Sequence, residues 1–474
     1  MEQKAHSVRP GLILAVLSLG GGAYALLQSL VVPALPVLQK DLHTSTSGVA
    51  WVFTSYLLAA SVVTPIAGRL GDMFGKKRVL VIALWGLAAG SLLAALVSSL
   101  ALMIVARTIQ GLGGAIFPLA FGILRDEFPR ERVAGAIALM SGILGIGGGL
   151  GIVLAGPILQ SLDYHWLFWL PLAVTAIAAA AAMILVPEST LRAPGNVHWL
   201  GAILLSGWLV ALLLAVSEAS TWGWGSAKTI GLIVLGAVIA VAWVWAEARS
   251  RHPLVDMTMM RLGGVWTTNL AALLLGFGMY SAFILIPQFV QTPASTGYGF
   301  GASVSQAGVF LVPTTIMLLV TSPLGGRLSN VVGSKVPLVL GSAITTVAFI
   351  VLALANARWE IYVASTLLGI GIGFAFASMA NLIVEAVPPG QTGVATGMNT
   401  IVRTIGGAIG AEVAASILAA SVTGGEPSKH GYTITFVICA VVVAVGILAS
   451  LAVPGRRVQP AHVLTVADPV ATGD

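Results

Sequence analysis

The residues with the clearest potential for chemistry lie in a short basic stretch between two long apolar runs. Its key members are Gly68, Asp72, Gly75, Lys76, Lys77 and Arg78. Glycine permits a tight chain reversal with closely packed backbone, and a Lys/Arg cluster between two membrane spans stays in the cytoplasm because its transfer through a bilayer is costly. An ordinary basic loop explains the three bases but leaves the Gly-x-x-x-Asp-x-x-Gly spacing unexplained.

A second candidate is an arginine inside an apolar run. Arg107 and Gln110 lie three residues apart and therefore on one face of a helix. Because an arginine inside a membrane is costly and normally faces a polar cavity, we expect Arg107 to face such a cavity. The alternative is a side chain that reaches the outer membrane surface.

Glu412 is the one acid placed well inside an apolar run. Loss of water disfavours the charged form of a carboxyl, so that such a group can bind and release a proton near neutral pH. Arg107, at a similar estimated depth, is a possible partner, whereas Arg403 lies ~13 Å along the same helix and faces elsewhere. A purely structural carboxyl, bonded to a neighbouring helix or facing water, is the alternative.

Several aromatic and amide side chains and one methionine in the apolar runs are candidates for an apolar substrate cavity with a few polar groups, although such residues also serve packing or face lipid. They are Gln28, Gln110, Asn269, Tyr280, Phe283, Phe374, Phe376, Met379 and Asn381.

The composition defines the class of protein that must position these groups. Of 474 residues 57% are hydrophobic and 8% are charged, far below the ~25% charged residues of soluble domains. The apolar runs repeatedly reach ~20 residues, the length of a membrane-spanning helix. A single cysteine, Cys439, excludes an intrachain disulfide, and we find no catalytic set, metal cluster or phosphate-binding loop. The sequence therefore predicts an all-α polytopic membrane protein that is not an enzyme, has no cofactor and does not bind nucleic acid.

Fourteen spans are expected, in an N-terminal six-helix bundle (11–187), two additional helices (198–248), a C-terminal six-helix bundle (265–453) and a disordered tail (454–474). The span estimates are 11–38, 49–70, 79–98, 100–124, 134–159, 166–187, 198–218, 229–248, 265–291, 304–326, 336–356, 361–384, 393–421 and 433–453. With both termini in the cytoplasm, 17 Lys and Arg residues fall in cytoplasmic segments and 4 in outer segments, as the positive-inside rule requires.

The two halves also repeat in sequence. Pro65, Gly68 and Arg69 recur 258 residues later as Pro323, Gly326 and Arg327. The same shift relates Gly135 to Gly393, while Asn330 stands where the first copy has Asp72. Two halves related by a parallel repeat are typical of transporters in which one bundle rocks against the other.

The fifth span is rich in small residues that let two helices approach closely, above all at Gly147, Gly151 and Gly156. This predicts a helix that packs at the interface between the two halves.

Together, the Gly68–Arg78 stretch and the Arg107 motif resemble the major facilitator superfamily. The fifth span is similar to the antiporter signature of its fourteen-span drug:proton antiporter branch, with Ile152 and Ala155 replacing a proline and a glycine. The resemblance implies a monomeric, multi-pass plasma-membrane protein, such as a bacterial inner-membrane protein, that exports hydrophobic small molecules in exchange for protons. It also implies that the Asp72 contact holds the halves closed on the inside and that Arg107 takes part in proton movement. Proton-linked or facilitated uptake of a nutrient, and a non-transporting receptor or scaffold, remain alternatives.

The first span departs from this family pattern. Leu27 and Val32 stand where such exporters usually have an aspartate and an asparagine. We therefore expect Glu412 to carry the proton in place of the missing acid.

For the Gly68–Arg78 stretch, we expect Asp72 to lie near Thr392 and Gly393.

Overall fold

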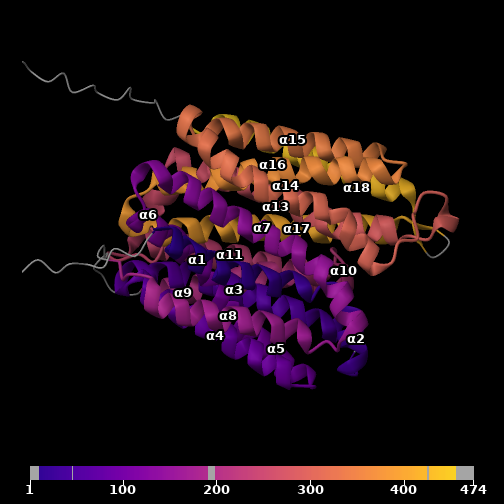
Figure 1. Cartoon of the computed structure of the whole chain (residues 1–474), viewed down its shortest axis with the longest axis horizontal. Coiled ribbons are helices and arrows are strands. Elements are labelled where there is room, and N and C mark those ends of the chain that lie inside the picture. Colours follow the sequence, from indigo (N-terminus) through magenta and orange to yellow (C-terminus); the bar gives the residue numbers. More distant parts are fainter. Residues whose placement is uncertain (1–9, 45, 190–197, 424–425, 455–474) are drawn as a thin grey trace, which may run out of the picture.

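The computed structural model describes residues 10–44, 46–189, 198–423 and 426–454. It shows long, nearly parallel and antiparallel helices side by side (Figure 1). In this part of the chain, fourteen helical segments are long and apolar enough to cross a membrane, which confirms the predicted fold class. Both ends of the described chain, Pro10 and Pro454, lie at one end of the bundle, which we call the terminal end; α2 and α10 lie at the opposite, distal end.

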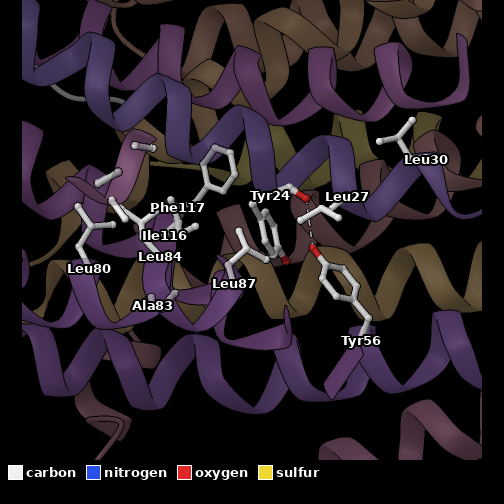
Figure 2. Close-up of a cluster of buried hydrophobic side chains, with 14 of the residues drawn as sticks. Tyr24, Leu27, Leu30, Tyr56, Leu80, Ala83, Leu84, Leu87, Ile116 and Phe117 are labelled. Carbon is white, nitrogen blue, oxygen red and sulfur yellow. Dashed lines mark hydrogen bonds between the residues drawn. The ribbon is translucent and has the colours of Figure 1, made fainter. Parts of the chain in front are cut away.

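The N-terminal bundle is built around one apolar core, part of which is shown in Figure 2. Its helices are α1 (Pro10–Leu30), α2 (Leu35–Asp41), α3 (Thr46–Phe74), α4 (Lys76–Leu96), α5 (Leu100–Gln110), η1 (Gly111–Ala115), α6 (Ile116–Glu127), α7 (Arg130–Ser161) and α8 (Trp166–Leu185).

Two expected span boundaries in this bundle were wrong. The first span ends at Leu30 instead of continuing to 38, because Pro33 and Pro36 disfavour helical conformation in the residues before them. The second span continues through the Gly68–Asp72 stretch to Phe74, and Gly75 alone, with φ 113°, makes the turn into α4. The predicted loop is therefore largely helical.

Two additional spans follow, α9 (Trp199–Ser217) and α11 (Ala227–Arg249), with the short helices α10 (Ala219–Trp222) and α12 (Met257–Met260). Helix α9 packs against both α3 and α17, and α11 packs against α9. Buried Glu247 fixes the end of α11, since its Oε2 accepts a hydrogen bond from the backbone N–H of Leu254 at 2.7 Å.

The C-terminal bundle has its own apolar core. Its elements are α13 (Gly263–Gln291), η2 (Ala294–Thr296), α14 (Val304–Val332), α15 (Lys335–Leu354), α16 (Arg358–Ala386), η3 (Pro389–Gln391), α17 (Thr392–Ala420), β1 (Val422–Thr423), β2 (Glu426–Pro427) and α18 (Lys429–Ala452). The tail predicted to be disordered lies outside the described residues beyond Pro454.

The sequence repeat has a counterpart in the contacts between the bundles at the terminal end. Gly68 of α3 packs on the backbone of Gly393 in α17, where an added Cβ would lie 2.6 Å from the Gly393 oxygen. Gly326 of α14 packs at the equivalent place on α7, where an added Cβ would lie 2.6 Å from Ala138 Cβ, 2.8 Å from the Ala134 oxygen and 3.0 Å from Gly135 Cα. At Gly68, Gly393 and Gly326 a side chain would separate the helices, whereas a Cβ at Gly135 would meet nothing within 4 Å.

Candidate functional site

A cavity of about 340 Å³ lies between the two bundles, in the half toward the distal end. It is lined by residues of α1, α3 and α7 from one bundle and of α13, α16 and α17 from the other. Its wall is mainly apolar, with a small number of polar groups. These are the usual properties of a small-molecule site.

Four of the nine predicted cavity residues line this cavity: Gln28, Tyr280, Phe283 and Phe376. Gln28 Nε2 donates a hydrogen bond to the Tyr280 hydroxyl at 3.3 Å. This bond joins α1 to α13 across the interface between the bundles.

The other five predicted residues lie elsewhere, because their side chains are used in contacts between helices. Gln110 is bonded to Arg107 and Ser91, and Asn269 accepts a bond from Asn399. Asn381 donates to the Ala134 carbonyl at 3.3 Å. Met379 is buried in the C-terminal core, and Phe374 packs against Gly325.

Glu412 lines the large cavity from α17 and is 9% exposed. Among the described residues it is the only ionisable acid or base in this wall, and Tyr280 is its only other titratable group. The carboxyl is therefore placed where a proton can reach it through the cavity while most of its surface is shielded from water.

Arg107 is fully buried in the interior of the N-terminal bundle and does not line the cavity, contrary to expectation. Its Nε donates to the Val52 carbonyl at 2.9 Å and its Nη1 to Gln110 Oε1 at 2.6 Å, while the guanidinium stacks on the Tyr56 ring, 4.2 Å from the centroid. Its contacts in the described chain are within its own bundle, so that the structure does not pair it with Glu412.

Two tyrosines connect this arginine with the interface between the bundles. The Tyr56 hydroxyl donates to the backbone carbonyl of Tyr24 at 3.2 Å, the bond drawn in Figure 2. The two rings lie 5.7 Å apart. Tyr24 in turn lines a small cavity that shares Gln28, Tyr280 and other wall residues with the large one.

The structure places Asp72 against the start of α17. The carboxylate is 1% exposed, and a Cβ at Gly393 would lie 3.1 Å from its Oδ2. The first backbone N–H groups of a helix favour a negative charge at this position. Arg125 of α6 adds to the contact by donating to Thr392 Oγ1 at 2.5 Å and to the Val387 carbonyl at 3.0 Å.

The three bases of the same stretch have different environments. Lys76 is fully buried, with its Nζ 2.8 Å from Asp126 Oδ2 and 3.7 Å from Asp72 Oδ1. The backbone N–H of Lys77 donates to Glu188 Oε1 at 3.2 Å, and Arg78 is exposed. Lys76 is therefore part of a buried charge cluster with Asp72. The sequence alone did not distinguish it from Lys77 and Arg78 in this respect.

We expect Gly68→Leu to shift the protein toward a conformation that is open at the terminal end. Overpacking costs about 1–3 kcal/mol, and each 1.4 kcal/mol changes a conformational ratio about tenfold. In a Cys439→Ala background, a cysteine at Thr400 should then react faster with a water-soluble thiol reagent added at the terminal end. Thr400 lines both small cavities, which lie nearer the start of α17 than the large cavity does.

Gly231→Leu is the matched control, because a Cβ at Gly231 has nothing within 4 Å. Equal reactivity of the Thr400→Cys probe in the Gly68→Leu and Gly231→Leu proteins would show that the Gly68 contact does not control closure.

The glycines of α7 lie against both halves. Gly147 and Gly151 contact α1, where Ser29 Oγ donates to the Gly147 carbonyl at 2.8 Å, and Gly156 contacts Ser305 of α14. Helix α7 is therefore in close contact with its own bundle and with the opposite one.

The sequence analysis missed Arg403 as a cavity residue. Arg403 is 8% exposed, stacks on the Phe376 ring at 4.6 Å from the centroid, and lines both small cavities. The signal was present, since an arginine inside a membrane span is costly wherever it occurs. Within the described residues, no three His, Cys, Asp or Glu side chains are arranged to hold a metal ion.

Comparison with known proteins agrees with this architecture. The chain is 29% identical over 394 residues to the tetracenomycin C resistance and export protein of Streptomyces glaucescens, covering 82% of this chain and 72% of that protein. It is 28% identical over 394 residues to multidrug resistance protein 3 of Bacillus subtilis, covering 81% and 74%. The solved human organic anion transporter MFSD10 (TETRAN) has a similar fold, with a TM-score of 0.67 at 17% identity, over 93% of this chain and 99% of that one.

The family model described as Major Facilitator Superfamily matches residues 17–411 and 299–470, which together span most of the chain. Together with the fourteen apolar helices and the cavity between two bundles, this match identifies the protein as a multi-pass membrane transporter rather than an enzyme, and the chain belongs to the Major Facilitator Superfamily.

Proposed function

We propose that the protein exports hydrophobic small molecules by exchange with protons, through alternating access of one cavity to the two sides of the membrane. The observation that carries this proposal is the apolar cavity of about 340 Å³ between the bundles, with Glu412 in its wall. Relatives named for tetracenomycin C export and multidrug resistance support the direction of transport and the class of substrate.

The contacts at the terminal end support alternating access. Three contacts join the two bundles on the terminal side of the cavity. They are Gly68 on Gly393, Gly326 on Gly135, and Arg125 on Thr392. If they separate while contacts at the distal end form, the cavity becomes accessible from the terminal end instead. The excess of Lys and Arg in loops at this end supports its assignment to the cytoplasm.

Glu412 is the proposed proton carrier. A carboxyl in an apolar wall that is reached from one side at a time can bind a proton on one side and release it on the other. Arg107 acts on this process from within the N-terminal bundle, through Tyr56 and Tyr24, rather than by direct contact. The protein functions as a monomer in this proposal, since the cavity is complete within one chain.

The direct test is accumulation of a compound in bacterial cells with and without the protein. Tetracenomycin C, which the name of the Streptomyces relative mentions, is a suitable probe. Lower accumulation in cells that contain the protein, and loss of this difference when the proton gradient is collapsed, are the expected results. A difference that persists without the gradient would contradict proton exchange, and higher accumulation would indicate uptake.

A further inference from the structure

We propose that the cavity selects molecules with an apolar body and one anionic group, and that Arg403 binds this group. The inference rests on the proposed transport function and specifies the substrate class of the same site. It begins from the observation that Arg403 is a permanent charge, is 8% exposed and lies between the bundles on the wall of two small cavities.

Among the described residues, Arg403 has no ion pair and its guanidinium makes no hydrogen bond; its side-chain contact is the face of Phe376. The described wall of the small cavity that Arg403 shares with Tyr24 holds no carboxylate, and its other titratable side chains are those of Tyr24 and Tyr280. Burial of an unpaired charge is costly, and the ring face offsets this cost only in part. A ligand anion would supply the missing counter-charge.

The small cavity with Arg403 adjoins the large one. Both are lined by Gln28, Leu57, Leu144, Tyr280 and Thr404. A ligand whose apolar part occupies the large cavity can therefore place a polar end toward Arg403.

Within the described chain, two hydrogen-bond donors at this end are unengaged, the Arg403 guanidinium and the Tyr280 hydroxyl, whereas the hydroxyls of Thr64, Thr400 and Thr404 already donate to backbone carbonyls. The Tyr280 hydroxyl accepts a bond from Gln28 Nε2, which leaves its own proton for a further acceptor. With the guanidinium of Arg403, this hydroxyl forms a donor set suited to a carboxylate or another delocalised anion.

Glu412 does not reverse this preference. It lies nine residues further along α17, ~13 Å toward the distal end, and it can lose its charge by binding a proton. Arg403 cannot lose its charge, so a cationic ligand that reaches this part of the cavity is repelled in every protonation state of Glu412.

Equilibrium binding to the purified full-length protein tests the inference without any gradient. The probes are 2-naphthoate, 2-naphthylmethanol and 2-naphthylmethylammonium, which share the apolar body and differ in charge. Thermal unfolding is followed with a thiol-reactive dye, because Cys439 is 1% exposed and reacts on unfolding. A ligand that binds the folded state raises the midpoint temperature of unfolding, and this rise increases with the concentration of the ligand.

We expect 2-naphthoate to stabilise the protein and the other two probes to have no effect at the same concentrations. Arg403→Gln should weaken naphthoate binding about ten- to hundredfold, the usual range for loss of hydrogen bonds to a charged group. Arg403→Lys should be intermediate, because it keeps the charge and loses the planar fork. Arg358→Gln is the matched control, since Arg358 also lies over a ring, that of Phe300, and neither residue lines any of the three cavities. This variant should bind naphthoate like the parent.

Tyr280→Phe provides a second variant if Arg403→Gln does not fold, and it should weaken naphthoate binding without changing the charge. The inference is overturned if the ammonium probe binds as tightly as naphthoate, if none of the probes stabilises the parent, or if Arg403→Gln or Tyr280→Phe binds naphthoate like the parent. The proposed export function is judged separately, by the gradient-dependent accumulation of tetracenomycin C. Its failure would leave a naphthoate-binding result intact.

Discussion

Glu412→Gln is expected to abolish uphill transport while exchange of substrate across the membrane continues. Glutamine has nearly the same shape as a protonated glutamate but cannot release a proton. Since the carboxyl is the only acid in the described wall of the large cavity, the variant should keep the cavity and lose the coupling to the gradient.

The measurement uses proteoliposomes and a compound that the parent protein transports. With a pH gradient imposed, accumulation by Glu412→Gln should fall to that of empty vesicles. Without a gradient, exchange of labelled for unlabelled compound should continue near the parent rate.

Glu218→Gln is the matched control. Glu218 lies outside the spans at the end of α9, beside the cavity residue Ser217, and burial raises the pKa of its carboxyl above the ordinary value. This variant should retain uphill transport. If Glu218→Gln loses it and Glu412→Gln pumps like the parent, the coupling group is Glu218.

Arg107→Met is expected to stop transport while leaving the protein at least as stable as the parent. The guanidinium is fully buried, and in the described chain it has no carboxylate partner. Its Nη2 also has no hydrogen-bond partner there. Burial of a charge without a counter-ion is costly, and an apolar side chain of similar size removes this cost, while Gln110 Oε1 loses its donor. If stability does not require the charge of Arg107, its presence in the bundle interior is best explained by an effect on the conformational and proton-binding equilibria of the transporter.

Thermal unfolding with the Cys439 reporter and vesicle transport are measured on the same preparations. Arg107→Lys keeps the charge but loses the stacking on Tyr56, and it should recover part of the transport. An Arg107→Met protein that unfolds far below the parent temperature would mean that this arginine is mainly structural.

Much of the fold was predictable because membrane helices have a direct sequence signal. A long apolar run with charges at its ends indicates a span without knowledge of its neighbours. The boundaries were less accurate where tertiary contacts override composition. The polar stretch up to Phe74 was expected to be a loop, yet it continues α3 because Lys76 lies near both Asp72 and Asp126 and compensates their negative charge in part.

The site was predictable only in part, since helical phase does not distinguish a face toward the cavity from a face toward the bundle interior. Both kinds of face tolerate polar side chains if partners are present. Gln28, Tyr280, Phe283 and Phe376 face the cavity. Arg107 faces inward, next to the 3-10 segment η1 that interrupts its span. Which partners are within reach depends on the packing of α1, α3 and α5, and this information is not local in the sequence.

The paired glycine contacts at the terminal end have a consequence for the origin of the chain. Gly68 meets Gly393 and Gly326 meets Gly135, and a shift of 258 residues converts one pair into the other. This reciprocal pairing is that of a two-fold homodimer, in which the same two patches meet twice. A half-length ancestor could thus have assembled with a second copy of itself before its gene was duplicated and fused. After fusion the two contacts were free to diverge, so that one now carries the carboxylate of Asp72 and the other the neutral amide of Asn330.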